Sequence, residues 1–325
     1  MASQYEMLTR AADAVAEKLG RAPIGVVLGS GLSEALDSLE RPQYLQYADI
    51  PGMPMTRTAG HPGALLFGRA GGVPVLALCG RIHIYEGRSL SDVAMPVRLL
   101  SLLGVHTLLV TSAVGSADPA LKPGDIMLVE DHINFSGVNV LAGDEEPRLG
   151  PRFPDMTAAY DSEALRILEE TARLAGVSCS RGVLAHFHGP SYETPAEVAM
   201  ARAAGARVVS MSMVPEVLVA RQRGMRVAGL ANVTNMAAGL QGRPLRHEEV
   251  LRSSAANVAN LQGLLAGALP RLGGGAVLGA GAHGAGVHGS VSGSNLSGAA
   301  SPPLAARGKG AGAPGAPGAP GDRRT

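Results

Sequence analysis

Apolar and polar residues along most of the chain follow two alternating patterns. Short runs that are apolar at nearly every position occur at 24–28, 73–78 and 107–111, and such runs predict strands that are covered on both faces. Between them, apolar residues recur on one helical face, as in 5–19, which predicts amphipathic helices. Further helices are predicted at 89–103, 161–175, 195–204, 215–223 and 247–269, and further strands at 182–187, 206–210 and 226–233. This alternation indicates an α/β fold, a single-domain mixed β-sheet flanked by helices.

The pattern ends near residue 273, where the composition changes. Residues 273–325 are rich in Gly, Ala and Pro, contain no aromatic residue and show no hydrophobic period. Such a segment cannot bury enough apolar surface to offset the entropy lost on ordering the chain. We therefore predict one folded domain at 1–272, large enough for a substantial core, and a disordered tail at 273–325.

Charge and composition restrict the kind of ligand. The 325 residues carry 28 Lys and Arg against 27 Asp and Glu, a net charge of +1, with no Trp, four Phe and six Tyr. A nucleic-acid surface would need a basic stripe with stacking aromatic residues, so the expected partner is a small molecule. Two cysteines exclude a disulfide framework and suit a reducing compartment. Without a membrane span or a secretion signal in the sequence, we expect a cytoplasmic protein with no membrane partner.

Small residues follow two of the predicted strands, at places where a ligand can reach the backbone. The turn Gly29-Ser30-Gly31 follows the strand at 24–28, and the segment 112–116 follows the strand at 107–111. Glycine lets backbone N–H groups approach an anion, and the hydroxyl of Ser30 adds a donor. The turn does not match GxGxxG, which disfavours dinucleotide binding. A purely structural tight turn is the alternative.

Three residues after the strand at 73–78 have the chemistry of a phosphate site. Arg81, His83 and Tyr85 alternate along the chain, so an extended segment would aim them to one side. A guanidinium fork beside an imidazole suits phosphate better than a neutral ligand. The alternative is a surface ion pair between Arg81 and Glu86.

Three later segments place further polar groups at the same edge of the sheet, where α/β proteins bind ligands. The segment 189–195 contains the carboxylate of Glu193, and the segment 232–235 contains the amide of Asn235. Ser212 precedes a predicted helix, as its N-cap or close to it, where hydroxyls and the helix N-terminus can bind an anion; ordinary capping is the alternative. No set of Cys, His, Asp and Glu has metal-ligand spacing, so we expect no metal. No GxSxG motif occurs, so the sequence shows no nucleophilic serine of that type.

Together and in this order, these segments resemble the trimeric, low-molecular-mass purine nucleoside phosphorylases. The resemblance covers about residues 5–269, and it includes further matching stretches at 123–128, 131–134, 152–156 and 247–250. It implies phosphorolysis, in which a purine (deoxy)nucleoside and inorganic phosphate give the free base and (deoxy)ribose 1-phosphate. It also implies a homotrimer that serves purine salvage, acts on inosine and guanosine, and uses no metal or organic cofactor.

The resemblance implies a role for individual residues of this chain. Phosphate would contact Ser30, His61, Arg81, His83, the backbone N–H of Ala113 and Ser212. The nucleoside would contact Tyr85 and Met211 through its sugar, His247 through its 5′-hydroxyl, and Tyr192, Glu193 and Asn235 through its base. His83, Glu193 and Asn235 would be the catalytic residues. Phe153 would enter the pocket of a neighbouring subunit in the trimer.

Three positions in the matching region depart from the family pattern. Ser112 stands where many relatives carry Asn, so hydrogen bonding beneath the phosphate or the base is expected to differ. Tyr192 replaces a frequent Phe beside the base, which is a mild change. Met236 replaces the Lys of vertebrate relatives, and this is expected to alter contacts with the base.

Two other functions fit the same scaffold. A 5′-methylthioadenosine phosphorylase would need an acidic residue in place of Asn235 and an apolar 5′ pocket, and His247 argues against its substrate and its pocket. A non-catalytic protein that binds a nucleoside or phosphate is the second alternative, which Arg81, His83 and Glu193 disfavour. Phosphorylases that accept adenosine belong to a hexameric group whose motifs do not occur in this sequence.

Overall fold

The computed structural model describes residues 3–273, apart from residues 59–60, 144–145 and 243. Every predicted helix and strand is present in these residues, and one predicted helix is divided in two. The helices are α1 (Gln4–Lys18), α2 (Leu90–Leu102), α3 (Ser162–Leu174), α4 (Pro195–Ala203), α5 (Val214–Gln222), α6 (His247–Ala256) and α7 (Val258–Gly273). The strands are β1 (Ile24–Leu28), β2 (Glu40–Gln46), β3 (Ala64–Ala70), β4 (Val73–Cys79), β5 (Thr107–Ser116), β6 (Ile126–Asn134), β7 (Cys179–His186), β8 (Ala206–Ser210) and β9 (Arg226–Met236). The predicted tail at 273–325 lies outside the described residues, except for Gly273.

These strands form one mixed sheet in the order β2-β3-β4-β1-β5-β8-β7-β6-β9. β1 pairs in parallel with β4 and β5, whereas β3 is antiparallel to β2 and β4. β5 pairs with β8 and also with β9, so the strands from β5 to β9 along this order close into a ring. The predicted mixed sheet flanked by helices is confirmed. The closure of its second half is a feature that the apolar pattern did not predict.

Three strands of the sheet escaped the sequence analysis, and each has a solvent-exposed part. β2 lies at the edge of the sheet and is exposed at every position but one. The second half of β6, residues 130–134, is exposed or half-buried, although its first half is fully buried. β3 ends in a Gly-Arg-Ala sequence with an exposed arginine. Continuous apolar runs were the criterion used to predict strands. Such a run is absent from β2 and covers only the first four residues of β3 and of β6.

β5 and β9 extend beyond their predicted ends, so the polar segments 112–116 and 234–235 lie within strands instead of following them. The two strands pair in parallel over their whole length, with a shift in register between Val114 and Gly115. Backbone hydrogen bonds hold this extension, and they do not require apolar side chains. The polar side chains of these segments are therefore fixed on strand backbone.

The helix predicted at 247–269 is two helices, α6 and α7, on either side of Asn257. The side chain of Asn257 is buried, and its Nδ2 donates to Oδ1 of Asn232 on β9 at 2.7 Å. Nδ2 of Asn260 donates to Oδ1 of Asn257 at 2.8 Å. Because asparagine is a weak helix former and has these partners here, it favours a break over one continuous helix.

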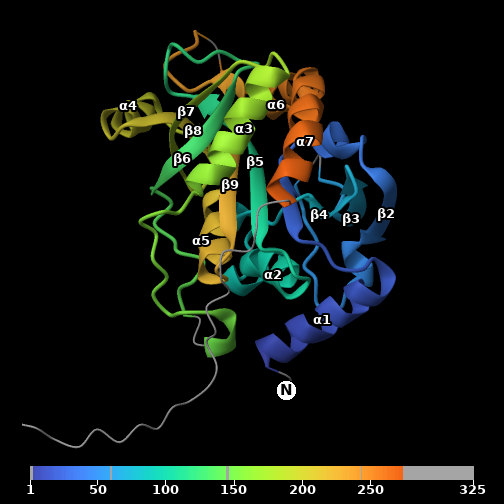
Figure 1. The fold of residues 1–325 in the computed structure, drawn as a ribbon. Helices are drawn as coiled ribbons and strands as arrows, with labels where there is room; N and C mark the ends of the chain where they lie inside the picture. The colour runs from blue at the N-terminus through green and yellow to red at the C-terminus, as the bar shows by residue number, and fades with distance from the viewer. Residues whose placement is uncertain (1–2, 59–60, 144–145, 243, 274–325) are drawn as a thin grey trace, which may run out of the picture. The chain divides into compact units, whose positions relative to one another are not determined.

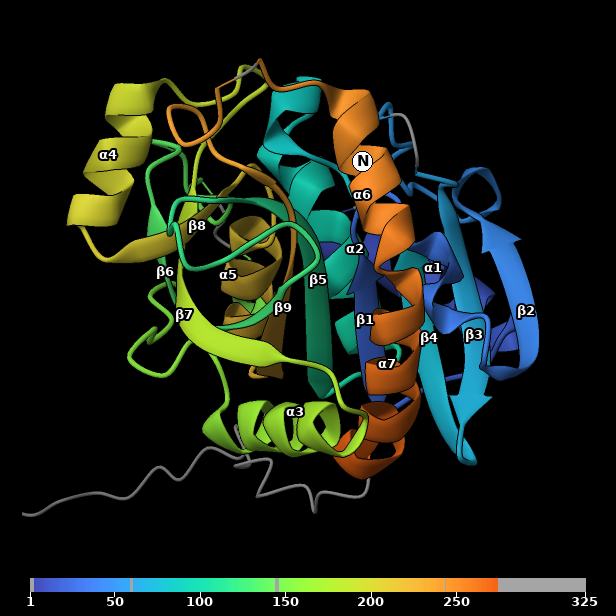
Figure 2. The same cartoon turned by 90° about the horizontal axis from the view of Figure 1, so that it is seen from above.

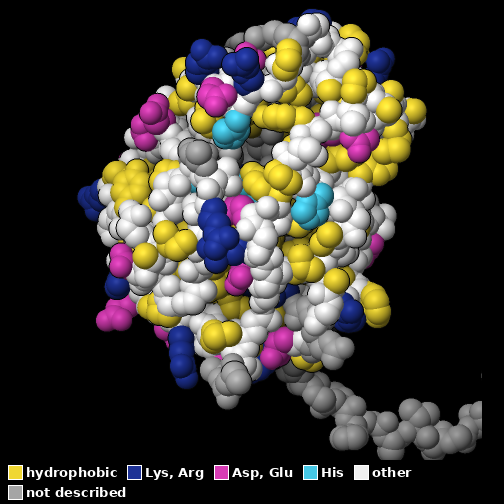
Figure 3. Space-filling model, turned by 180° about the vertical axis from the view of Figure 1, so that it is seen from behind, with side chains coloured by type: hydrophobic (Ala, Val, Ile, Leu, Met, Phe, Trp, Pro, Cys, Tyr) yellow, Lys and Arg dark blue, Asp and Glu magenta, His cyan; other side chains and the backbone are white. Residues whose placement is uncertain are grey.

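Helices cover both faces of the sheet around β1 (Figure 1). Figure 2 shows α6 and α7 in front of β1, with α1 and α2 behind it. β1 is buried at all five positions, as expected for a strand between two helical layers. On the face shown in Figure 3, basic, acidic and apolar side chains are intermingled. Within the described part of the chain, no helix is long and apolar enough to cross a membrane.

Candidate active site

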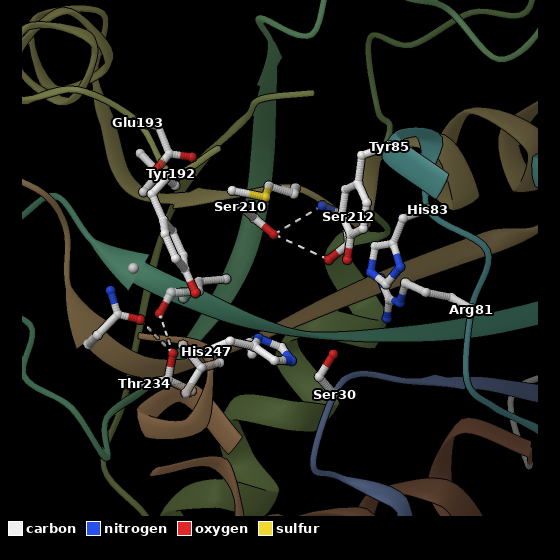
Figure 4. A pocket seen from close by; sticks show the side chains of 17 residues that line it. Ser30, Arg81, His83, Tyr85, Tyr192, Glu193, Ser210, Ser212, Thr234 and His247 are labelled. Carbon is white, nitrogen blue, oxygen red and sulfur yellow. Dashed lines mark hydrogen bonds between the residues drawn. The ribbon is translucent and has the colours of Figure 1, made fainter. Parts of the chain in front are cut away.

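A cavity lies where β1, β4, β8 and β9 end, beside the C-terminal part of β5. It contains about 640 Å³ of empty space, part of which is open solvent. Its walls are formed by Ser30, Arg81, His83, Tyr85, Ala113, Val114, Gly115, Tyr192, Glu193, Val209, Ser210, Met211, Ser212, Thr234, Asn235, His247 and Val250. Figure 4 shows the polar side chains at two ends of this cavity. One end carries Ser30, Arg81 and His83, and the other carries Tyr192, Glu193 and Thr234.

The cavity brings together the site residues selected from the sequence, with two exceptions. His61 does not line the cavity; it contacts Ser30 instead. Phe153 lies elsewhere and is 88% exposed, so it has no part in the cavity of its own chain.

Ser30 is oriented by the imidazole of His61. Ser30 Oγ lies 3.0 Å from Nε2 of His61, and Nδ1 of His61 accepts from the backbone N–H of Arg81 at 3.3 Å. Burial, together with the nearby His83 and Arg81, lowers the pKa of His61 to about 3. The ring is therefore neutral at pH 7, carries its proton on Nε2 and donates to Ser30. This assignment leaves the hydroxyl proton of Ser30 for a ligand.

Arg81 is a buried cation with an incomplete set of partners. It is 3% exposed, its Nη1 lies 3.3 Å from Oε1 of Glu216, and its Nη2 donates to the carbonyl of Thr111. The ion pair with Glu216 replaces the surface pair with Glu86 that was the alternative reading of the sequence. The 3.3 Å contact is not aligned as a hydrogen bond, and among the described residues neither Nε nor Nη1 has a hydrogen-bond partner. Unused N–H groups on a buried guanidinium favour an anion beside them.

His83 is oriented by the carboxylate of Glu86. Nδ1 of His83 donates to Oε1 of Glu86 at 3.1 Å, and the backbone N–H groups of His83 and Arg57 donate to the same carboxylate at 2.8 and 2.7 Å. Burial acts to raise the pKa of Glu86, but these hydrogen bonds lower it to about 2. Burial also lowers the pKa of His83, against the effect of Glu86. A neutral His83 with its proton on Nδ1 keeps Nε2 as a hydrogen-bond acceptor.

Ser212 lies one residue before the N-cap of α5, close to it as expected, but its side chain is not the cap. The N-cap is Met213, whose φ is 76°, and the helix begins at Val214. Ser212 Oγ lies 2.7 Å from Ser112 Oγ and 3.2 Å from Ser210 Oγ. The left-handed conformation of Met213 turns the chain sharply between the strand and the helix. The carbonyl of Ser212 accepts from the N–H of Val214 at 3.0 Å, while its hydroxyl contacts Ser112 on β5. The departure at Ser112 thus has a structural counterpart, a hydroxyl contact beneath Ser212.

The opposite end of the cavity carries a carboxylate and an amide. Burial raises the pKa of Glu193, and its own backbone N–H opposes this effect. Oδ1 of Asn235 accepts from Thr234 Oγ1 at 2.8 Å, and Nδ2 of Asn235 donates to the carbonyl of Met236 at 3.0 Å. These bonds fix the orientation of the amide and leave one N–H and one lone pair for a ligand. Met236 contributes this backbone carbonyl, and its side chain does not line the cavity.

Tyr85, Met211 and His247 line the cavity together with these two groups. The ring of Tyr85 stacks on His83, with 4.6 Å between the centroids. Gly189 packs against this wall: a Cβ there would lie 2.6 Å from the sulfur of Met211, and its φ is 73°. Only glycine fits both requirements. A second hollow lies beside the cavity and shares Tyr85, Met211 and His247 with it.

Several residues of the site were not found from the sequence. Ser210 and Thr234 line the cavity, and the alternation Ser210-Met211-Ser212 could have identified the first of them. Glu216 pairs with Arg81, and no local pattern relates these two residues, which are distant in the sequence. In the part of the chain that the structure describes, no group of three or more His, Cys, Asp and Glu residues is arranged to hold a metal ion.

Comparison with known proteins identifies the family. The model of the Phosphorylase superfamily matches residues 23–270. Purine nucleoside phosphorylase 1 of Bacillus subtilis (strain 168) is 44% identical over 247 residues, which cover 76% of this chain and 91% of that protein. The purine nucleoside phosphorylase of Bos taurus is 40% identical over 261 residues, covering 77% of this chain and 90% of that protein. The crystal structure of schistosoma purine nucleoside phosphorylase with hypoxanthine has a TM-score of 0.79 and 34% identity, and the match covers 84% of this chain and 99% of that one. The chain therefore belongs to the phosphorylase superfamily, among the low-molecular-mass purine nucleoside phosphorylases that its motifs resemble.

Proposed function

We propose that this member of a family that carries out purine nucleoside phosphorolysis acts on 6-oxopurine nucleosides: inosine, guanosine and their deoxy forms. Phosphate binds at the Arg81 end of the cavity, and the purine binds at the Glu193 end. The observation that carries the proposal is the polarity of the cavity (Figure 4): buried donors without full partners at one end, and a buried carboxylate at the other. Related schistosoma enzymes have been solved with guanosine and with inosine.

At the phosphate end, the donors outnumber the acceptors in the way that a phosphate dianion requires. Ser30 and Ser212 donate through their hydroxyls, Arg81 donates through its unused N–H groups, and Ala113 donates through its backbone N–H. The monohydrogen form of phosphate also has one P–OH group, and the free Nε2 of His83 can accept from it. His61 acts on phosphate through Ser30, because it donates to the Ser30 hydroxyl at 3.0 Å.

At the base end, the purine is selected by whether its hydrogen-bond donors and acceptors match those of Glu193 and Asn235. A 6-oxopurine has an N1–H donor, which an ionised Glu193 can accept. This hydrogen bond also offsets the burial that raises the pKa of Glu193. Adenine has an acceptor at N1, so two acceptors would oppose each other in a buried site. Sites built on such pairing reject the mismatched analogue by factors of about 10⁴ or more.

The reaction breaks the bond between C1′ and N9 and forms a bond between C1′ and a phosphate oxygen. The electron pair of the broken bond goes to the purine, and positive charge develops on the sugar. Phosphate, held by Arg81 and the serines, stabilises the sugar cation and then attacks C1′. The remaining N–H of Asn235 donates to N7 of the departing base. Donors placed where charge develops supply the largest part of many rate enhancements, at about 2.7–4 kcal/mol for one such group.

Two observations outside the cavity support the proposed homotrimer and the proposed cytoplasmic location. Phe153 is the most exposed of the large apolar side chains that the structure describes, at 88%, and in a homotrimer it would be covered by the pocket of a neighbouring subunit. The described cysteines are both free, which agrees with a cytoplasmic enzyme of purine salvage. Inorganic phosphate is the co-substrate, and no metal or organic cofactor takes part.

One experiment tests the function directly. Inosine loss is followed with and without phosphate, beside adenosine and 5′-methylthioadenosine, and in the presence of a metal chelator. The proposal requires phosphate-dependent cleavage of inosine and guanosine, formation of ribose 1-phosphate, and no effect of the chelator. Cleavage of 5′-methylthioadenosine at the same efficiency would contradict it, as would binding of inosine without turnover. The comparison with adenosine is informative because a Schistosoma mansoni relative has been solved with that nucleoside.

A further inference from the structure

Three buried hydroxyls form a triangle beneath the phosphate end of the cavity. Ser112 Oγ lies 2.7 Å from Ser212 Oγ and 3.0 Å from Ser210 Oγ, and the last two are 3.2 Å apart. Ser210 and Ser212 line the cavity, and dashed lines in Figure 4 connect them. Ser112 lies behind them, is 0% exposed and does not line the cavity. Ser112 therefore cannot act on a ligand except through its two neighbours.

Each hydroxyl has a single proton, so the directions of these hydrogen bonds depend on one another. The backbone N–H of Ser212 donates to Ser210 Oγ at 3.2 Å. Ser112 Oγ also lies 3.0 Å from the carbonyl oxygen of Ala113, which can only accept. If Ser112 donates to Ala113, the 2.7 Å contact is a hydrogen bond only when Ser212 donates to Ser112. In that case the lone pairs of Ser212 would face the anion and repel it.

We propose that Ser112 is a positioning residue that donates to Ser212, so that the proton of Ser212 points to phosphate. This inference rests on the proposed phosphate site and adds the group that orients one of its donors. The protons then run in one direction, from Ser210 to Ser112, from Ser112 to Ser212 and from Ser212 to phosphate. Each of the three hydroxyls donates once and accepts once, because Ser210 accepts from the N–H of Ser212.

The last acceptor of the chain favours this direction. The 2.7 Å contact between Ser112 and Ser212 has the length of a good O–H···O hydrogen bond whichever hydroxyl donates. In the opposite direction the chain would end on the neutral carbonyl of Ala113, whereas in the proposed direction it ends on a phosphate anion, which is the stronger acceptor. Hydrogen bonds in a buried chain of this kind polarise one another, so the last donor, Ser212, becomes stronger when it faces the anion.

A double-mutant cycle tests the inference. Phosphate KM at saturating inosine, and inosine KM at saturating phosphate, are measured for Ser112→Ala, Ser212→Ala and the double variant. Ser112→Ala is expected to raise the phosphate KM about tenfold, equivalent to about 1.4 kcal/mol, with a change in inosine KM below about twofold. In the Ser212→Ala background the same substitution is expected to add nothing, because Ser112 acts through Ser212.

Controls separate positioning from packing. Ser116→Ala removes another 0% exposed hydroxyl from the same strand, one that donates to the carbonyl of Asp118 at 2.7 Å, and it should leave the phosphate KM unchanged. Ser112→Cys keeps the volume and only a weak donor, so it should behave as Ser112→Ala does even where alanine destabilises the fold. Equal effects of Ser112→Ala in both backgrounds, or none in either, would overturn the inference. An unchanged phosphate KM in Ser212→Ala would instead show that phosphate does not bind where the proposed function places it.

Discussion

Replacing Arg81 by methionine removes two roles of the guanidinium at once, its ion pair with Glu216 and its proposed binding of phosphate. Arg81 is 3% exposed and Glu216 is 6% exposed, so methionine would leave a buried carboxylate with no cation beside it. The guanidinium donors that face the cavity would be lost in the same step. A second substitution can separate the two consequences.

The size of the stability loss follows from the geometry of the pair. Two unit charges at 3.3 Å attract each other by about 5 kcal/mol at an effective dielectric constant of about 20. Removal of one partner from a buried pair costs about 3–5 kcal/mol by experience with other proteins. In a domain of this size, 1 kcal/mol corresponds to about 2–4 °C in Tm. Arg81→Met is therefore expected to lower Tm by on the order of 10 °C.

The variant Arg81→Met/Glu216→Met restores stability without restoring phosphate binding. With both charges replaced by apolar side chains, the desolvation cost of the pair disappears, and such replacements are often neutral or stabilising. The phosphate KM should stay raised in both variants, by about 10- to 100-fold, because a hydrogen bond to a charged group contributes about 1.5–3 kcal/mol. Arg98→Met is the matched control, since Arg98 is buried but does not line the cavity.

The assay combines thermal unfolding with steady-state kinetics. Tm is measured with and without added phosphate, because a ligand that binds the folded state raises Tm, and the phosphate KM is measured at saturating inosine. The reasoning is refuted if Arg81→Met keeps the phosphate KM of the wild type. It is also refuted if the double variant regains phosphate affinity together with its stability, because Arg81 would then act only as the partner of Glu216.

Three further expectations concern the substrate, the pH dependence and the quaternary structure, and a fourth concerns the tail. Asn235→Asp should narrow the preference for inosine over adenosine, measured as a ratio of kcat/KM, because an acid can accept from the 6-amino group and the amide donor is lost. Burial lowers the pKa of His186 to about 3, so below pH 6.5 the unfolded state binds a proton that the folded state does not, and stability falls as the pH drops. His186→Met should therefore reduce the loss of unfolding free energy between pH 7 and pH 5 by about 2 kcal/mol, followed by denaturant titration at both pH values. Phe153→Ala should raise the inosine KM with little change in the phosphate KM, and a monomer by light scattering would contradict the trimer on which this rests. A chain that ends at Leu272 should keep its activity and Tm, and a loss of several degrees would contradict the domain boundary.

The sequence predicted the parts of the fold that bury a whole face or a whole strand. β1 is buried at every position, so its apolar run was unambiguous, and α3 shows a regular amphipathic stripe between its Asp161 cap and Leu174. β2 could not be predicted in this way, because its side chains are exposed at every position but one. Its place in the sheet depends on pairing with β3. Asn257 divides the last helix through a bond to Asn232, and such a contact is invisible to any local pattern.

The residues of the candidate site also differ in whether the sequence alone could identify them. Residues at strand ends could be selected because their chemistry is unusual for their place, as with Arg81 and Glu193. The residues that orient them could not, because Glu216 and Ser210 become neighbours of Arg81 and Ser112 only when the strands assemble. The expectation that Ser212 lies at the N-cap of α5 or close to it also came from local pattern alone. Ser212 does precede the N-cap, Met213, but the local pattern did not show that its hydroxyl contacts Ser112 and Ser210.

One strand, β5, supports both ends of the cavity. It pairs with β9 along one edge, and with β1 and then β8 along the other, so it is shared by the open part of the sheet and by the closed ring. At its phosphate end, Thr111 Oγ1 accepts from the N–H of Gly29 at 2.9 Å, which fixes the turn that carries Ser30. At its base end, a Cβ on Gly115 would lie 3.1 Å from Nδ2 of Asn235, so glycine is what lets the amide reach its place. In the proposed function, a single length of strand therefore sets the distance between phosphate and base, and the nucleophile and the leaving group would be held on the same rigid element.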